Sequence, residues 1–100
     1  MTSKERPYLR SMANTMDPVL YIGKEGVTQG VVQQAWDALE ARELIKVAVQ
    51  REAPFETARE ACGELCERTH AEPVQCIGMK FVIYRSARKG PHLLDEMKKA

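Results

Sequence analysis

Two glycines three residues apart, with a lysine between them, have the residue types and spacing best suited to holding an anion in this sequence. They belong to the segment Tyr21-Ile22-Gly23-Lys24-Glu25-Gly26-Val27-Thr28. Glycine tolerates positive φ and places no side chain between the main chain and a ligand. A helix that starts directly after such a loop directs unpaired amide hydrogens and the positive end of its dipole at the same point, and Lys24 adds a mobile cation. The pattern therefore predicts a site for the phosphate groups of a phosphodiester backbone.

The same glycines also have a purely structural explanation, which the sequence leaves open. A tight turn from a strand into a helix needs glycine whether or not the turn binds a ligand. The loop is too short for a Walker-type phosphate loop, and no G-x-G-x-x-G pattern follows it, so the sequence disfavours nucleotide binding.

Charge is distributed unevenly along the chain, although the net charge is only +1 at pH 7. Residues 31–75 carry five basic and nine acidic side chains, whereas residues 76–100 carry six basic and two acidic ones. A polyanion responds to a local patch more than to the net charge. The C-terminal quarter of the chain is therefore a candidate second contact for a polyanion. An acidic helix surface beside a basic tail is the alternative explanation.

The pattern of apolar residues predicts the elements that must position these groups. Helices are expected at residues 5–14, 28–42 and 54–70, and strands at residues 19–22, 44–50, 74–77 and 80–85. The order is α-β-α-β-α-β-β. Helices between the first strands imply parallel pairing, and the short turn at Gly78 and Met79 implies that the last two strands are antiparallel. We therefore expect an α/β fold with a four-stranded mixed sheet.

Capping residues and periodicity define the two longer helices. Thr28 is a candidate N-cap for the helix at residues 28–42, because its hydroxyl can accept a hydrogen bond from the first turn. Pro54 suits the first position of the third helix, where its missing amide hydrogen costs nothing. The residues expected to face the core at helical spacing are Val32, Ala35, Trp36, Leu39, Ala58, Cys62, Leu65, Cys66 and Thr69.

Three segments together resemble a known family. They read VLYIGKEGVT at residues 19–28, ALE and ELIKV within residues 38–47, and VQCIG and VIYR within residues 74–85. In this order and spacing they resemble the CRM domain (chloroplast RNA splicing and ribosome maturation), and best its stand-alone bacterial form, the YhbY family. The resemblance implies a fold similar to the C-terminal domain of translation initiation factor 3. It also implies RNA binding and, for the bacterial members, association with precursors of the large ribosomal subunit.

The resemblance also implies which residues contact RNA. The loop of the family corresponds to Gly23, Lys24, Glu25 and Gly26, and its basic strand positions correspond to Lys46 and Arg85. Two positions depart from the family. Met79 stands where many relatives have lysine, with Lys80 one position on, and Ala48 stands where a second lysine often follows. The full set of expected RNA contacts is Gly23, Lys24, Glu25, Gly26, Lys46, Lys80, Tyr84, Arg85, Arg88 and Lys89.

Aromatic residues add a further candidate contact, since single-strand binders stack bases on aromatic rings. Tyr84 is expected to share a strand face with Lys80 and could stack on a base. Trp36 lies on the apolar stripe of its helix and is expected in the core.

Cysteine and histidine side chains on the third helix raise the question of a metal site. Cys62, Cys66 and His70 follow one another at four-residue steps, and Cys76 comes soon after, so the four could hold zinc. The C-x-x-C spacing usual in structural zinc sites does not occur, and Cys62 and Cys66 lie on the apolar stripe. Core packing is the favoured interpretation. A disulfide between them is disfavoured by a reducing compartment.

Composition and titratable residues argue against several function classes. His70 and His92 are the histidines that could activate a nucleophile, and neither has a suggested partner. We therefore expect no enzyme, no cofactor and no small-molecule substrate. No run of about 18 apolar residues suits a membrane span, and the polar N-terminus does not resemble a secretory signal. Three cysteines without framework spacing indicate the cytoplasm.

We expect one RNA-binding domain over residues 1–86 and a basic tail over residues 87–100 that could form a short helix. The expected partner is RNA, either ribosomal RNA or a pre-ribosomal particle, and the expected state is a monomer. The alternative is a protein-interaction module of the same fold that makes no direct RNA contact. The acidic segment at residues 31–75 motivates this alternative.

Overall fold

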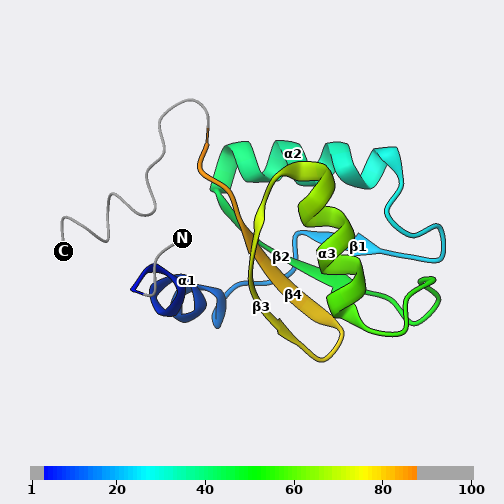
Figure 1. Ribbon diagram of the computed structural model, residues 1–100, viewed down its shortest axis with the longest axis horizontal. Coiled ribbons are helices and arrows are strands. Elements are labelled where there is room, and N and C mark those ends of the chain that lie inside the picture. The colour runs from blue at the N-terminus through cyan, green and yellow to red at the C-terminus, as the bar shows by residue number, and fades with distance from the viewer. Residues whose placement is uncertain (1–3, 88–100) are drawn as a thin grey trace.

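A single four-stranded sheet organises the computed structural model, which describes residues 4–87. The helices are α1 (Glu5–Ala13), α2 (Gln29–Arg42) and α3 (Ala58–Thr69), and the strands are β1 (Leu20–Ile22), β2 (Leu44–Val49), β3 (Glu72–Ile77) and β4 (Lys80–Tyr84). The sheet order is β1-β2-β4-β3 (Figure 1). Strand β1 is parallel to β2, whereas the β2–β4 and β3–β4 pairs are antiparallel. The predicted α/β fold with a mixed sheet is confirmed.

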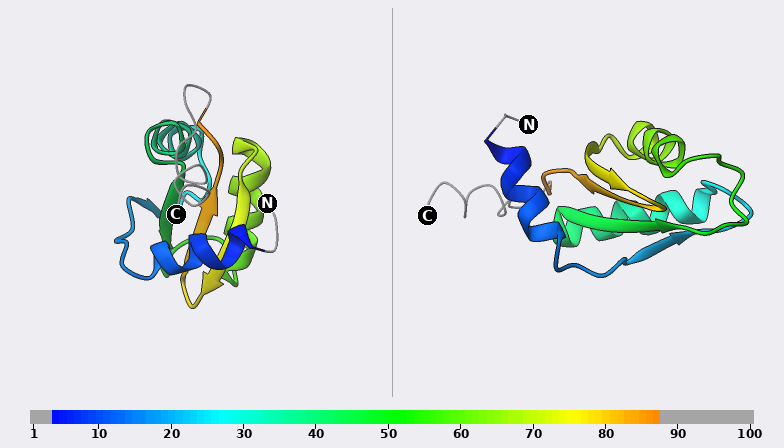
Figure 2. Two further views of the ribbon diagram at one scale, coloured as in Figure 1. Left: turned by 90° about the vertical axis from the view of Figure 1, so that its left-hand side faces the viewer. Right: turned by 90° about the horizontal axis from the view of Figure 1, so that it is seen from below.

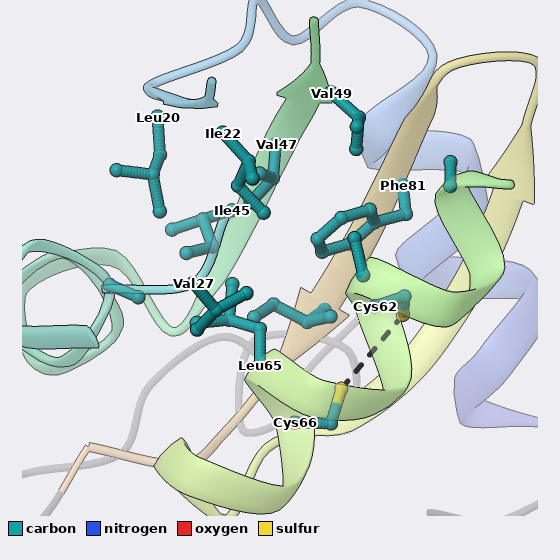
Figure 3. Packing of buried hydrophobic residues seen from close by; sticks show 14 of the residues in the cluster. Leu20, Ile22, Val27, Ile45, Val47, Val49, Cys62, Leu65, Cys66 and Phe81 are labelled. Carbon is teal, nitrogen blue, oxygen red and sulfur yellow. Dashed lines mark hydrogen bonds between the residues drawn. The ribbon is translucent and has the colours of Figure 1, made fainter. Parts of the chain in front are cut away.

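The helices divide between the two faces of the sheet. Helices α2 and α3 cover one face, and α1 crosses the other face near one end (Figure 2). The larger core cluster lies between the sheet and the α2–α3 pair and includes Phe81 of β4, Ile45 of β2 and Leu65 of α3 (Figure 3). A smaller cluster lies under α1 and comprises Leu9, Ala13, Leu44, Val74, Val82 and Tyr84.

Strand β2 shows how the alternation of side chains fills both clusters. Ile45, Val47 and Val49 are buried against α2 and α3, as their alternation predicts. Lys46 and Ala48 point to the opposite face and are half-buried. Because α1 packs only near the Leu44 end of this strand, the rest of that face has no helix over it.

Helix α3 begins later than the sequence analysis predicts. Its N-cap is Thr57, whose hydroxyl accepts a hydrogen bond from the amide of Glu60 at 3.4 Å. The carboxylate of Glu60 accepts one in return from the Thr57 amide at 3.1 Å, which completes a capping box. The prediction that Pro54 occupies the first helical position is therefore wrong. Helix α3 ends at Thr69, and His70 is its C-cap, with a φ of 63° and an amide that donates to the Cys66 carbonyl.

Glu43 is a buried acid that joins the end of α2 to the segment after β4. It adopts a φ of 66°, and its side chain is fully buried. Its carboxylate accepts a hydrogen bond from the Ala87 amide at 2.7 Å, and its carbonyl accepts one from the Arg85 amide at 2.9 Å. Residues 88–100 lie outside the described part of the chain, and with them most of the expected tail.

We predict that Thr57→Ala lowers the free energy of unfolding by about 1 kcal/mol, because the amide of Glu60 loses its acceptor. Urea unfolding followed by circular dichroism measures this change. Thr57→Ser keeps the hydroxyl and serves as the control, with a stability close to that of the parent protein. Equal stability of the alanine and serine variants would show that the capping box contributes nothing.

Candidate nucleic-acid interface

The glycine loop forms a closed turn between β1 and α2, as the sequence predicts. The Gly26 amide donates to the Gly23 carbonyl at 2.9 Å, and Gly26 has a φ of 74°. Lys24 and Glu25 are exposed at the tip of this turn. Thr28 accepts a hydrogen bond from the Val31 amide at 3.1 Å and so caps α2, which confirms its predicted role. The turn therefore leads directly into a helix start.

Both glycines of the turn also have a packing reason. A Cβ on Gly23 would lie 2.9 Å from Oε1 of Gln50, and one on Gly26 would lie 3.1 Å from Cγ of Pro54. The main chain is joined there as well, since the Gln50 amide donates to the Ile22 carbonyl at 2.8 Å. The structural explanation that the sequence left open thus applies to Gly26, which also has a positive φ, and less strictly to Gly23, since the exposed Gln50 side chain can move. Gly26 is buried, whereas Gly23 is half-buried and Lys24 and Glu25 are exposed.

A surface hollow of about 540 Å³ lies between this turn and the segment that follows β2. Lys24, Gln50, Arg51 and Glu52 line it, so its lining carries two cations and one acid. Figure 1 shows both loops at the same end of the molecule, away from α1. The sequence analysis did not single out Arg51. Its position directly after a strand parallel to β1 is the signal that could have found it, because parallel strands end at the same edge of a sheet.

Arg68 of α3 is a second cation beside the loop that the sequence analysis missed. Its guanidinium donates to the Val27 carbonyl at 2.7 Å and to Oε1 of Gln29 at 3.1 Å. Both acceptors are uncharged, so these contacts hold the loop exit against α3 without neutralising the cation. Forty-one residues of sequence separate Arg68 from Val27, so no local pattern indicates the contact.

Lys46 and Lys80 lie on the sheet face that α2 and α3 do not cover. Lys80 pairs with Ala48, and Lys46 pairs with Val82, so strand alternation places both lysines on the same face. They line a shallow pocket together with residues of β3 and with Asn14. The two lysines therefore belong to a surface separate from the hollow beside the glycine turn.

Arg85 makes its contacts within the fold. Its guanidinium donates to the Thr69 carbonyl at 2.7 Å and to the Glu40 carboxylate at 3.0 Å. It also lies 4.1 Å from the centre of the Trp36 ring, and 12% of its side chain is exposed. This arrangement braces α2 against the end of α3 and β4. The sequence predicts an RNA contact at Arg85, but the charge of this side chain is already paired with that of Glu40. Trp36, predicted in the core, is half-buried beneath it.

Tyr84 is buried beneath α1, with 4% of its surface exposed. Its hydroxyl is hydrogen-bonded to the Ser86 hydroxyl at 2.8 Å, and burial raises the pKa of the phenol. The prediction that Tyr84 offers a ring to a base is wrong, because α1 packs on the strand face that it shares with Lys80. Arg88 and Lys89, the other expected contacts, lie outside the described residues.

Cys62 and Cys66 pack in the larger core cluster, as predicted, with their Sγ atoms 4.0 Å apart (Figure 3). This contact, together with burial, raises the pKa of the Cys66 thiol. Cys76 is half-buried against the same cluster, and His70 is exposed at the end of α3. Within residues 4–87, no group of three or more histidine, cysteine or acidic side chains is placed to hold a metal ion. No helix in this range is long and apolar enough to span a membrane.

The sequence and the fold of this chain are similar to those of several known proteins. The "Probable RNA-binding protein YqeI" of Bacillus subtilis is 33% identical over 93 residues, which cover 93% of this chain and 96% of the relative. An "RNA-binding protein" of Haemophilus influenzae is 34% identical over 89 residues, 89% of each chain. The solution structure of the hypothetical protein SAV1595 from Staphylococcus aureus superposes with a TM-score of 0.75 at 42% identity, covering 90% of this chain and 93% of that one.

The family comparison covers the same part of the chain that forms the fold. Residues 1–85 match the family described as the CRS1 / YhbY (CRM) domain, and this range holds the glycine turn, the hollow and all four strands. The chain therefore belongs to the CRS1 / YhbY (CRM) domain family.

Proposed function

We propose that this protein binds RNA, and that the hollow beside the glycine turn receives its phosphates. The observation that carries the proposal is the pairing of Lys24 with Arg51 at the edge where β1 and β2 both end. Relatives that align with nearly the whole chain are named as RNA-binding proteins, which supports RNA as the polyanion.

The electrostatics of the hollow suit a phosphate backbone. Lys24 and Arg51 are both exposed, so a phosphate can reach them without desolvating a buried charge. Outside the hollow, where the glycine turn leads into α2, the helix start carries the positive end of a dipole, and the Arg68 guanidinium contacts Val27 and Gln29 through uncharged acceptors. Glu25 and Glu52 offset part of this attraction. We therefore expect binding that depends on the phosphate backbone and that weakens steeply with salt.

The family resemblance supports a more specific role. We propose that the bound RNA is ribosomal RNA and that the protein assists assembly of the large ribosomal subunit in the cytoplasm. We further propose that it acts as a monomer, through binding and not through catalysis. The domain would span residues 1–86, and the basic residues Arg88 and Lys89 of the tail at residues 87–100 would add contacts to the backbone.

We predict that Lys24→Glu weakens binding of single-stranded RNA at least tenfold and leaves the Tm within a few degrees, because the side chain is exposed. If about four phosphates are neutralised, the logarithm of affinity falls with the logarithm of salt at a slope of about −3. Fluorescence anisotropy with a labelled single-stranded RNA over a salt series measures both quantities.

A matched pair of variants separates the local effect from net charge. Lys24→Gln and Arg42→Gln each remove one positive charge, and Arg42 lies in the last turn of α2, at the far end from the glycine turn. Only the Lys24 variant is expected to reduce the magnitude of the salt slope, by about 0.7. An equal response of the two variants, or a salt-independent affinity, would contradict the proposed site.

We predict that Gly26→Val damages both folding and binding. Its φ of 74° is strained for any residue with a Cβ, and the new side chain would meet Pro54. The free energy of unfolding should fall by roughly 2 kcal/mol or more. Gly63→Ala is the matched control, because a Cβ there meets nothing within 4 Å and alanine favours the helix. A Gly26→Val protein as stable as the parent would show that the turn is not constrained.

A further inference from the structure

The sheet face that α2 and α3 do not cover presents a row of side chains across all four strands. Tyr21 of β1 pairs with Ala48 of β2, Ala48 pairs with Lys80 of β4, and Lys80 pairs with Ile77 of β3. Helix α1 packs on this face only near Leu44, at the other end of β2 (Figure 2). The row therefore lies in the open part of the face.

Exposed apolar side chains lie on both edge strands of this face. Tyr21 is 56% exposed and Ile77 is 66% exposed, although both are in strands. The other large apolar residues exposed within residues 4–87 adjoin them: Val19 precedes β1, and Met79 lies in the turn between β3 and β4. The Val19 amide donates to the Lys46 carbonyl at 2.9 Å, which fixes it beside β2. Because every exposed large apolar side chain within residues 4–87 belongs to this face or borders it, the face is the part of the described surface best suited to contact an apolar group.

The polar groups that line the open part of this face are cationic or neutral. A shallow pocket of about 150 Å³ there is lined by Asn14, Lys46, Gln75, Ile77, Lys80, Phe81 and Val82. None of these residues is acidic, so the pocket offers two ammonium groups and two amides beside exposed apolar surface. This combination complements a ligand that carries both negative charge and flat apolar surfaces, as a single-stranded nucleic acid does.

We propose that this open face is a platform for a single-stranded segment of the RNA, with a base stacked on Tyr21 and the adjoining phosphates beside Lys80 and Lys46. The proposal rests on the proposed function and adds the class of RNA. A duplex presents its phosphates but not the faces of its bases, so only unpaired nucleotides can use an exposed ring. Tyr21 lies two residues before Gly23, so an RNA strand bound at the hollow can continue onto this sheet face.

The test uses two RNA probes, two Tyr21 variants that keep the surface apolar, and one variant that removes a positive charge. The probes are an oligouridine of about 12 nucleotides and a duplex of the same length. Tyr21→Leu is expected to weaken oligouridine binding at least fivefold and to leave duplex binding and the salt slope unchanged, because it removes a ring and no charge. Tyr21→Phe keeps the ring and should bind like the parent protein. Lys80→Gln should reduce the magnitude of the slope by about 0.7.

Three outcomes would overturn the platform alone, and a fourth would remove the proposed function together with it. If Tyr21→Leu binds oligouridine like the parent while Lys24→Gln binds less tightly, the platform is wrong and the proposed function stands. If Tyr21→Leu weakens oligouridine and duplex binding equally, the ring has no role specific to unpaired bases. If Tyr21→Leu alters only the sedimentation of RNA-free protein, the face docks a second copy. Failure of the parent protein to bind either probe removes the proposed function itself.

Discussion

The parallel pairing of β1 with β2 is the constraint on which the candidate interface depends. Because the two strands run the same way, with Ile22 opposite Val49, their carboxyl ends meet at one edge of the sheet. The chain must turn into α2 after one strand and toward α3 after the other. The glycine turn and the segment from Gln50 to Pro54 are therefore forced together. The hollow and its two cations exist because of this juxtaposition.

The same sheet separates structural charges from exposed ones. Arg85 follows the last strand of the sheet, and its guanidinium lies between Glu40 and the Trp36 ring, where it braces two helices. Lys46 and Lys80, by contrast, extend from the central strands toward the face that α1 leaves partly open. Net charge along the sequence does not distinguish these cases. What matters is whether packing supplies a counter-charge, as Glu40 does for Arg85.

Local patterns in the sequence predict most of the fold, because alternation and helical spacing report burial directly. The alternation of Ile45, Val47 and Val49 identifies the core face of β2, and Thr28 identifies the start of α2. The start of α3 was predicted wrongly although its signal is local. The capping-box pattern T-x-x-E at Thr57 competes with Pro54, and two reciprocal hydrogen bonds outweigh the mere tolerance of proline at a first turn.

The candidate site was predicted less completely, since its membership depends on contacts between distant segments. Tyr84 shares a strand face with exposed Lys80, and only the placement of α1 buries it. Arg68 of α3 contacts Val27 in the loop before α2, and no spacing rule relates the two residues. Residues that belong to the glycine turn itself were found because a turn is a local structure. Residues that tertiary packing adds to the site, or removes from it, were not.

Packing and binding make compatible demands on the glycine turn. The positive φ of Gly26 and the approach of Pro54 require glycine at that position for folding alone, whereas Gly23 only lies against the end of the exposed Gln50 side chain. Yet this close approach is also what brings Arg51 to the side of Lys24. A bulkier turn would push the two segments apart and disperse the cations. At the proposed anion site, the glycines would therefore act indirectly, by fixing the distance between two segments, more than by exposing their own main chain.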